Sequence, residues 1–128
     1  RAKEIIKKYP DIRGFLGTSS YDAPGAGKAI EELGKIGQCF TAGTSVTSVA
    51  EPYLASGAVA AVTCWDPADA GYVMNVSAKM ILEGKKDEIK TGLDLGVKGF
   101  DNITVDGKYI NGEGWIVITK DNMKEYDF

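Results

Sequence analysis

Three times along this chain, a short run of strand-forming residues leads into a polar turn and then into a helical pattern. The three runs are residues 12–17, 39–43 and 59–65. Helical patterns follow them at 24–33, around 52–54 and at 66–83. This repeated order is typical of parallel strands joined by right-handed crossovers, with helices covering the sheet. The sequence therefore predicts an α/β domain of three layers, a parallel sheet between two layers of helices.

The third repeat is the best defined. Its strand, 59–65, is almost unbroken in apolar character, as in a strand buried on both faces. Asp66 and Pro67 supply residues that helices prefer at the N-cap and the first position, and Asp69 adds a carboxylate to the first turn. Gly84 ends the pattern.

The two ends of the chain depart from this rhythm. Residues 2–9 have an apolar helical face, and Pro10 ends that helix. Because a domain rarely begins on the last turns of a helix, we expect further residues upstream of Arg1. Towards the other end, we expect a hairpin over 102–110 with Asp106 and Gly107 in its tight turn, a strand at 115–118 and a closing helical turn at 120–126.

The composition excludes several classes of function. The chain has 128 residues, 18 acidic and 15 basic, and a net charge of −3, so we expect no nucleic acid or anionic membrane as a partner. The absence of histidine removes Ser-His and Cys-His nucleophiles and most catalytic zinc sites. The longest apolar run, 58–62, is far shorter than the roughly 20 residues of a membrane helix. We therefore expect no catalytic residues, no metal and no cofactor.

The two cysteines, Cys39 and Cys64, are predicted to be buried thiols. If their strands are parallel neighbours, the sulfurs are offset by roughly three residues, or about 10 Å. A disulfide tolerates Cα separations only up to about 7 Å, so we expect no bridge.

Polar and aromatic side chains follow each predicted strand at its carboxyl end. They are Thr18, Ser19 and Ser20 after the first strand, Ser45 after the second, and Trp65 and Asp66 after the third. In open α/β sheets, ligands bind outside this edge. Hydroxyls and a carboxylate can hydrogen-bond a neutral polyol while an indole ring stacks on its C–H face. Acid–base catalysis would need titrating groups of separated pKa, which this set lacks.

Each of these residues also has a purely structural interpretation. A serine in such a loop can satisfy a turn amide, Asp66 is a helix cap whether or not it touches a ligand, and Trp65 can be a core residue. Phosphate motifs are incomplete: in 22–29, Ala29 replaces the Ser/Thr of a Walker loop. The prediction of a binding site therefore depends on the three loops converging.

Six stretches of the chain resemble the type I periplasmic binding proteins, and several resemble the subgroup that binds rhamnose or the quorum signal autoinducer-2. These stretches are 6–12, 48–57, 63–67 with 71–72, 105–108, 116–122 and 124–128. The resemblance implies a two-lobed receptor that closes on a small polar ligand and delivers it to an ABC permease. It also implies a periplasmic protein, or an extracellular lipoprotein anchored to the membrane.

The resemblance implies the same ligand contacts that the strand ends indicate. The family's contacts fall on Thr18, Ser19 and Ser20, then on Ser45, and then on Trp65 and Asp66. Sugar-binding relatives often carry an aspartate at the position of Ser19 and an acidic residue at that of Ser45, so this chain departs from them at both.

A complete receptor of this family is more than twice as long as this chain. We therefore expect residues 1–128 to be a carboxyl-terminal lobe fragment. Its partners would be a sugar or autoinducer-2, the missing N-terminal part of the same receptor as a second chain, and the permease.

The leading interpretation is the ligand-binding part of a transport receptor, with no covalent chemistry. Two alternatives stay open: the effector-binding domain of a LacI-type regulator, which has the same fold, and a flavodoxin-like enzyme. The incomplete phosphate motifs and the missing histidine argue against the enzyme.

Overall fold

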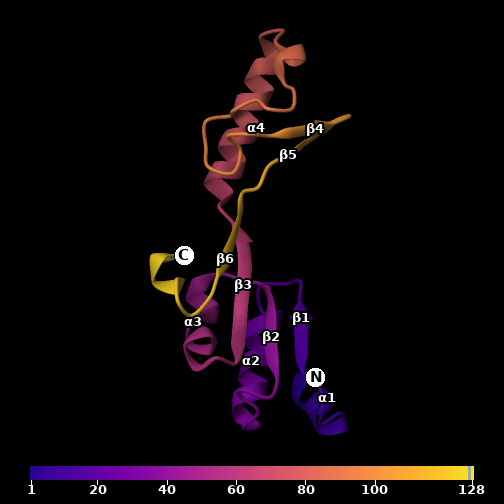
Figure 1. Cartoon of the computed structure of the whole chain (residues 1–128), viewed down its shortest axis with the longest axis vertical. Helices are drawn as coiled ribbons and strands as arrows, with labels where there is room; N and C mark the ends of the chain where they lie inside the picture. Colours follow the sequence, from indigo (N-terminus) through magenta and orange to yellow (C-terminus); the bar gives the residue numbers. More distant parts are fainter. Residues whose placement is uncertain (127) are drawn as a thin grey trace. The chain divides into compact units, whose positions relative to one another are not determined.

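The computed structural model describes residues 1–126 and 128, and it has an α/β fold (Figure 1). Its larger sheet has the strand order β1-β2-β3-β6, and its smaller sheet pairs β4 with β5. The strands are β1 Gly14–Gly17, β2 Phe40–Thr44, β3 Val59–Trp65, β4 Thr104–Asp106, β5 Tyr109–Asn111 and β6 Trp115–Ile118. The α-helices are α1 Ala2–Lys8, α2 Asp22–Glu32, α3 Thr47–Ser56 and α4 Pro67–Leu82, and the 3-10 helices are η1 Lys86–Glu88 and η2 Met123–Glu125. The predicted fold class, a mostly parallel sheet flanked by helices with a hairpin near the C-terminus, is confirmed.

The first three strands run parallel and end at the same edge of the sheet. Gly17 at the end of β1 aligns with Gly43 in β2. Thr44, the last residue of β2, aligns with Thr63 in β3. This register brings the loops that follow β1 and β2 to one edge, as the repeat predicts.

The chain forms two compact units. Unit 1 comprises Arg1–Cys64 and Val117–Phe128, and unit 2 comprises Trp65–Ile116. Both β3 and β6 contain residues of each unit, so two strands connect the units covalently. The assignment of all 128 residues to one lobe of a larger receptor stays a prediction.

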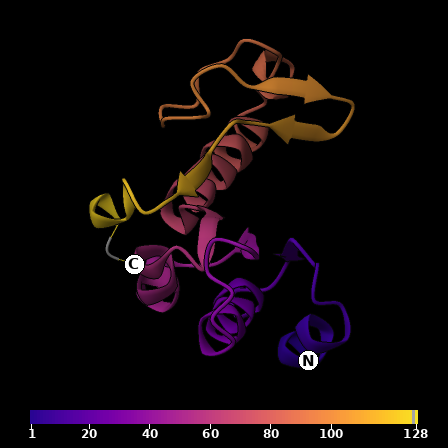
Figure 2. The same ribbon diagram turned by 60° about the horizontal axis from the view of Figure 1, so that its bottom comes forward.

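The core of unit 1 lies between the sheet and its helices. Helix α2 packs on β1 and β2 and contacts α1 and α3, and Figures 1 and 2 show these three helices on one side of the parallel strands. The side chains of Ile30, Leu54, Val59 and Val62 are fully buried there. Because Gly27 has no side chain, α2 can approach the ring of Tyr53 on α3.

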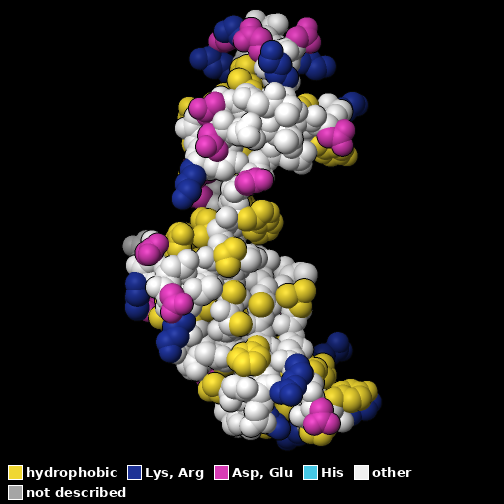
Figure 3. Space-filling view, in the orientation of Figure 1, with side chains coloured by type: hydrophobic (Ala, Val, Ile, Leu, Met, Phe, Trp, Pro, Cys, Tyr) yellow, Lys and Arg dark blue, Asp and Glu magenta, His cyan; other side chains and the backbone are white. Residues whose placement is uncertain are grey.

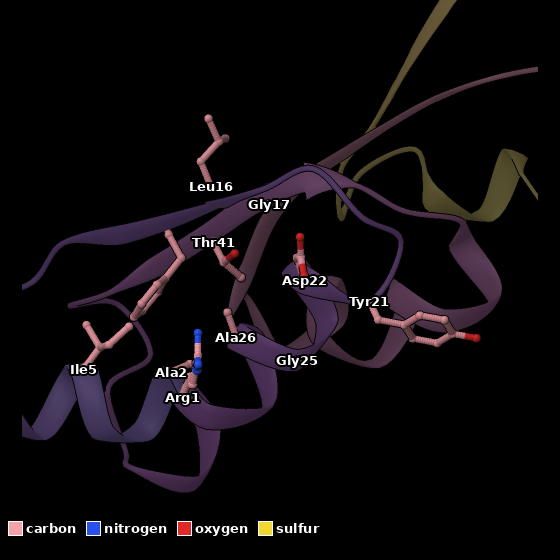
Figure 4. A pocket seen from close by; sticks show the side chains of 11 residues that line it. Arg1, Ala2, Ile5, Leu16, Gly17, Tyr21, Asp22, Gly25, Ala26 and Thr41 are labelled. Carbon is pink, nitrogen blue, oxygen red and sulfur yellow. The ribbon is translucent and has the colours of Figure 1, made fainter.

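The opposite face of β1 and β2 is exposed, so the second helix layer that the sequence predicts does not cover these two strands. Leu16 leaves 84% of its surface in solvent and Phe40 43%. Figure 4 shows Leu16 pointing to the side of β1 opposite α1 and α2, and Figure 3 shows hydrophobic side chains spread over unit 1. Unit 1 therefore presents an apolar sheet face beside the edge strand β1.

Unit 2 is built on α4. Its core is formed by Val73 on the helix with Leu95 and Ile103 from the segment that follows. The hairpin β4–β5 pairs Asp106 with Tyr109. The two central residues of the turn are therefore Gly107, with φ of 59°, and Lys108. The sequence predicts Asp106 and Gly107 at these positions, so the turn lies one residue later than expected.

Helix ends differ from the expected ones by a few residues. α2 begins at Asp22 rather than Pro24, and Pro24 is buried within its first turn. α3 is a complete helix that contains Pro52 and ends at Gly57 in the left-handed conformation. Both helices begin earlier than expected, because only four residues separate β1 from α2 and only two separate β2 from α3.

Cys39 and Cys64 are both buried and form no disulfide, as predicted. Thr63, next to Cys64, aligns with Thr44, whereas Cys39 precedes β2 altogether. The offset along the strands is therefore larger than the expected three residues. Burial raises the pKa of the Cys39 thiol.

Candidate ligand-binding site

The loop after β1 presents three hydroxyl side chains to solvent. Thr18, Ser19 and Ser20 are all exposed. Asp22 fixes the shape of this loop, because its Oδ2 accepts hydrogen bonds from the backbone N–H of Thr18 at 3.2 Å and of Ser19 at 3.0 Å. The same aspartate begins α2, where a carboxylate is favoured by the helix dipole.

Two glycines allow the loops after β1 and β2 to lie close together. A Cβ at Gly43 would come within 3.0 Å of three backbone atoms of Gly17. The two strands can end side by side in this way because position 43 carries no side chain. At Gly17 a Cβ would instead overlap Cβ of Asp22, at the start of α2.

Ser45, which follows β2, is completely buried. Its Oγ donates a hydrogen bond to the carbonyl oxygen of Ser20 at 2.7 Å. The structure thus brings two predicted site residues together, with Ser45 supporting the backbone of the hydroxyl-rich loop. A direct contact between Ser45 and a ligand stays a prediction.

Trp65 and Asp66 begin unit 2. Asp66 is the N-cap of α4, and its Oδ1 accepts a hydrogen bond from the backbone N–H of Ala68 at 2.7 Å. Pro67 occupies the first helical position, so the local sequence Asp-Pro fixes where the helix begins. Trp65 is the last residue of β3 and leaves 50% of its surface exposed.

A cavity of about 190 Å³ opens beside Trp65 within unit 2. Its aromatic walls are Trp65, Trp115 and Phe100. The carboxylates of Asp66 and Asp69 also line it, and no lysine or arginine is among the described residues of its lining. An aromatic pocket with acidic groups suits an uncharged ligand that has an apolar face and hydroxyl donors.

Sequence reasoning missed Trp115, Phe100 and Asp69 as residues of this pocket. The sequence places Asp69 only in the first turn of α4 and Trp115 only in a strand. A signal existed in the run Gly112-Glu113-Gly114-Trp115, since glycines that flank an aromatic residue often mark close backbone packing. Nothing in the sequence indicated that this run lies beside Trp65.

A second cavity of about 380 Å³ lies in unit 1 between α1, β1 and α2 (Figure 4). It is lined by residues such as Arg1, Ile5, Tyr21 and Asp22. None of the predicted site residues lines it, so we do not assign the ligand to this cavity.

The six predicted contacts are therefore divided between the two units. The hydroxyl-rich loop and Ser45 belong to unit 1, and Trp65 and Asp66 belong to unit 2. Their convergence on one ligand stays a prediction.

Within the described part of the chain, no three cysteine or acidic side chains are grouped to hold a metal ion. Among the described helices, none is both long and apolar enough to cross a membrane.

Residues 1–86 match a family described as "Periplasmic binding protein domain". This match covers the whole of the repeated strand–turn–helix region and the start of unit 2.

Solved structures share the fold along nearly the whole chain. A sugar ABC transporter from Actinomyces odontolyticus ATCC 17982 is 19% identical over 99% of this chain and 41% of its own, with a TM-score of 0.81. LsrB from Clostridium saccharobutylicum, in complex with AI-2, is 21% identical over 99% of this chain and 43% of its own, with a TM-score of 0.67. An ABC transporter solute binding protein from Clostridium phytofermentas, with bound L-rhamnose, is 16% identical over 98% of this chain and 43% of its own, with a TM-score of 0.72. This chain thus spans less than half the length of each of these proteins.

Proposed function

The chain belongs to the periplasmic binding protein domain family, and from this premise we propose that it is the ligand-binding part of an ABC-transporter solute-binding protein for a small sugar-like ligand. The observation that carries the proposal is the half-exposed ring of Trp65 in a pocket with two carboxylates. An indole face offers stacking to the C–H face of a sugar, and the carboxylates accept hydrogen bonds from its hydroxyls.

The chemistry of the residues supports this ligand class. Thr18, Ser19 and Ser20 would supply hydroxyls from unit 1, and Trp65 and Asp66 would supply the ring and a carboxylate from unit 2. A rhamnose-type sugar or autoinducer-2 fits this set, because both are small polyols. The complexes of two similar proteins with AI-2 and with L-rhamnose support this class.

The function requires binding alone, with no covalent step. The ligand would stabilise a closed arrangement of the receptor through contacts that the open arrangement lacks, which is a shift of population. An ABC permease would then receive the ligand. The remainder of the receptor and the permease are the partners that this function needs, at the outer side of a membrane.

The test begins with native mass spectrometry of the purified chain, followed by denaturation. A small released mass would identify the ligand and would distinguish a hexose-type sugar from the smaller quorum signal. If the chain carries no ligand, the ¹⁵N-labelled protein is titrated with L-rhamnose, D-arabinose and autoinducer-2, and amide shifts are followed by NMR.

We expect weak saturable binding, with a Kd of roughly millimolar, because the chain holds only part of the contacts. Absence of both a released ligand and a saturable shift with any of the three compounds contradicts the proposed function.

A further inference from the structure

Both tryptophans of the chain meet in unit 2. The ring centroids of Trp65 and Trp115 are 5.4 Å apart with their planes at 83°, an edge-to-face arrangement that aromatic pairs favour. Nevertheless, 50% of Trp65 and 60% of Trp115 stay exposed. The two rings contact each other and still expose about half of their surface, so they can pack against the apolar face of a ligand.

A glycine-rich turn packed around Phe100 holds the backbone that leads into Trp115. A Cβ at Gly114 would lie 2.7 Å from Cε2 of the Phe100 ring, and a Cβ at Gly112 would lie closer still. Real side chains do not tolerate such distances, so the ring requires glycine at both positions. Trp115 comes directly after this turn, so the packing of the two glycines on Phe100 determines where its backbone begins.

Gly99 secures the same turn from the other side. The backbone N–H of Glu113 donates a hydrogen bond to the carbonyl oxygen of Gly99 at 2.6 Å. Gly99 itself has φ of 83°, which favours glycine, and a Cβ there would lie 2.7 Å from Cα of Gly114. The two backbone segments are therefore closely packed, and Trp115 follows directly from this packed turn.

The charge and size of the pocket restrict its occupant. Two carboxylates, Asp66 and Asp69, line it without a basic residue among its described lining, so an anionic ligand would be repelled. Asp66 accepts the hydrogen bond from Ala68 through its Oδ1, so its Oδ2 and the carboxylate of Asp69 can both accept from ligand hydroxyls. At about 190 Å³ the cavity is smaller than the roughly 300–1,000 Å³ of drug-sized sites, which favours a single small ring.

We propose that Trp115 is a second ligand-facing wall of this pocket, positioned by Phe100, Gly112 and Gly114, and that the pocket selects an uncharged monosaccharide over an anionic one. The inference rests on the proposed function and adds a specificity-determining residue and a charge preference to it.

The experiment follows the indole N–H signals of the two tryptophans in the ¹⁵N-labelled full chain. Trp65→Phe and Trp115→Phe assign the two signals. Titration with L-rhamnose, and separately with D-arabinose, is expected to shift both indole signals with one common Kd for the sugar that binds. In Trp115→Ala, that Kd is expected to rise roughly threefold to tenfold, whereas Trp115→Phe keeps most of the affinity. D-Galacturonate is expected to give no saturable shift.

Two further variants separate the role of Trp115 from general damage. Tyr109→Ala removes an aromatic residue of unit 2 that is 73% exposed and lies outside the pocket, and it should leave the Kd unchanged. Gly114→Ala should displace Trp115 from Phe100, weaken the exciton signal that the indole pair gives in circular dichroism, and raise the Kd.

The outcomes distinguish the inference from the function on which it rests. Unchanged sugar affinity in a folded Trp115→Ala variant, or equal binding of D-galacturonate, overturns the inference and leaves the proposed function standing. If the wild-type chain binds neither neutral sugar, the inference is overturned. The proposed function is overturned with it only if autoinducer-2 also gives no saturable shift and denaturation releases no ligand.

Discussion

At the scale of single residues, the edge of the sheet that carries the hydroxyl-rich loop depends on the pair Gly17 and Gly43. The backbones of β1 and β2 approach so closely there that no side chain fits at position 43. Thr18 and Thr44 directly follow the two glycines, so the spacing of the glycines also sets the spacing of the loops. A side chain added at position 43 would therefore lower the stability of the fold and also displace the loops of the predicted site.

Gly43→Ala is therefore expected to destabilise the chain by about 2 kcal/mol or more, because the new methyl group would overlap the backbone of Gly17. Urea unfolding followed by circular dichroism measures the change. Gly25→Ala is the matched control: it lies in α2 with no atom within 4 Å of the new Cβ, and it should be neutral or stabilising by up to about 1 kcal/mol. Equal stability of the two variants would show that the close approach of β1 and β2 is not required.

The same residues show what sequence could and could not reveal about the site. The loops after the strands were correctly placed, because the repeat fixes where each strand ends. The burial of Ser45 was not foreseeable, because a serine that follows a strand can donate its hydrogen bond either to a ligand or to a neighbouring backbone carbonyl. Trp115 was missed because its contact with Trp65 joins positions far apart in the chain, and one sequence carries no information on that pairing.

At the scale of elements, α4 begins where the sequence says it should. Asp66 caps the helix and Pro67 occupies its first position, and the strand before it has the predicted bounds, Val59–Trp65. These features are local, which is why sequence alone predicted them. The hairpin turn was displaced by one residue, because two-residue turns need glycine at a particular central position and Asp106 proved to belong to the strand.

Two substitutions of Asp66 distinguish the capping hydrogen bond from the negative charge at the start of α4. Asp66→Ala should lower the free energy of unfolding by about 1 kcal/mol, because the backbone N–H of Ala68 loses its acceptor. Asp66→Asn keeps a capping oxygen and should unfold within about 0.5 kcal/mol of the wild type. Urea denaturation gives both values. A large loss in Asp66→Asn would mean that the negative charge, and not the hydrogen bond, stabilises the helix start.

An ion pair between Lys3 and Glu32 links helix α1 to α2. The hydrogen bond from Lys3 holds the pKa of the Glu32 carboxyl below its usual range. Because the folded-state pKa is lowered, the pair stabilises the fold above the ordinary carboxyl pKa, and this contribution is lost as the pH falls through the lowered value. Since the pair is exposed, added salt should weaken it.

Lys3→Ala is expected to raise the pKa of Glu32 towards its ordinary value, as measured by the carboxyl carbon shift during an NMR titration. The pKa of Glu83 serves as an internal reference, because Lys85 and not Lys3 holds it down. A Glu32 pKa that stays low in Lys3→Ala would assign the effect to Lys28 instead.

At the scale of the whole molecule, the exposed sheet edge is the feature that most affects behaviour in solution. β1 lies at the edge of the four-stranded sheet, and Leu16 at its centre is 84% exposed. A strand edge with unpaired N–H and C=O groups and an apolar face is a template for another strand. The proposed function would place a further segment of the receptor against this edge.

In the absence of that partner, the chain is expected to associate with itself through β1. Sedimentation velocity over a range of concentrations should show an average mass that rises with concentration. Leu16→Lys should reduce this association, because a charge at the edge opposes pairing and removes apolar contact. Leu82→Lys is the matched control, since Leu82 on α4 is similarly exposed, at 88%, but belongs to a helix of unit 2 and not to β1. If the wild type stays monomeric at the highest concentration, the edge does not recruit a strand; if Leu82→Lys has the larger effect, the contact surface lies on α4 instead of β1.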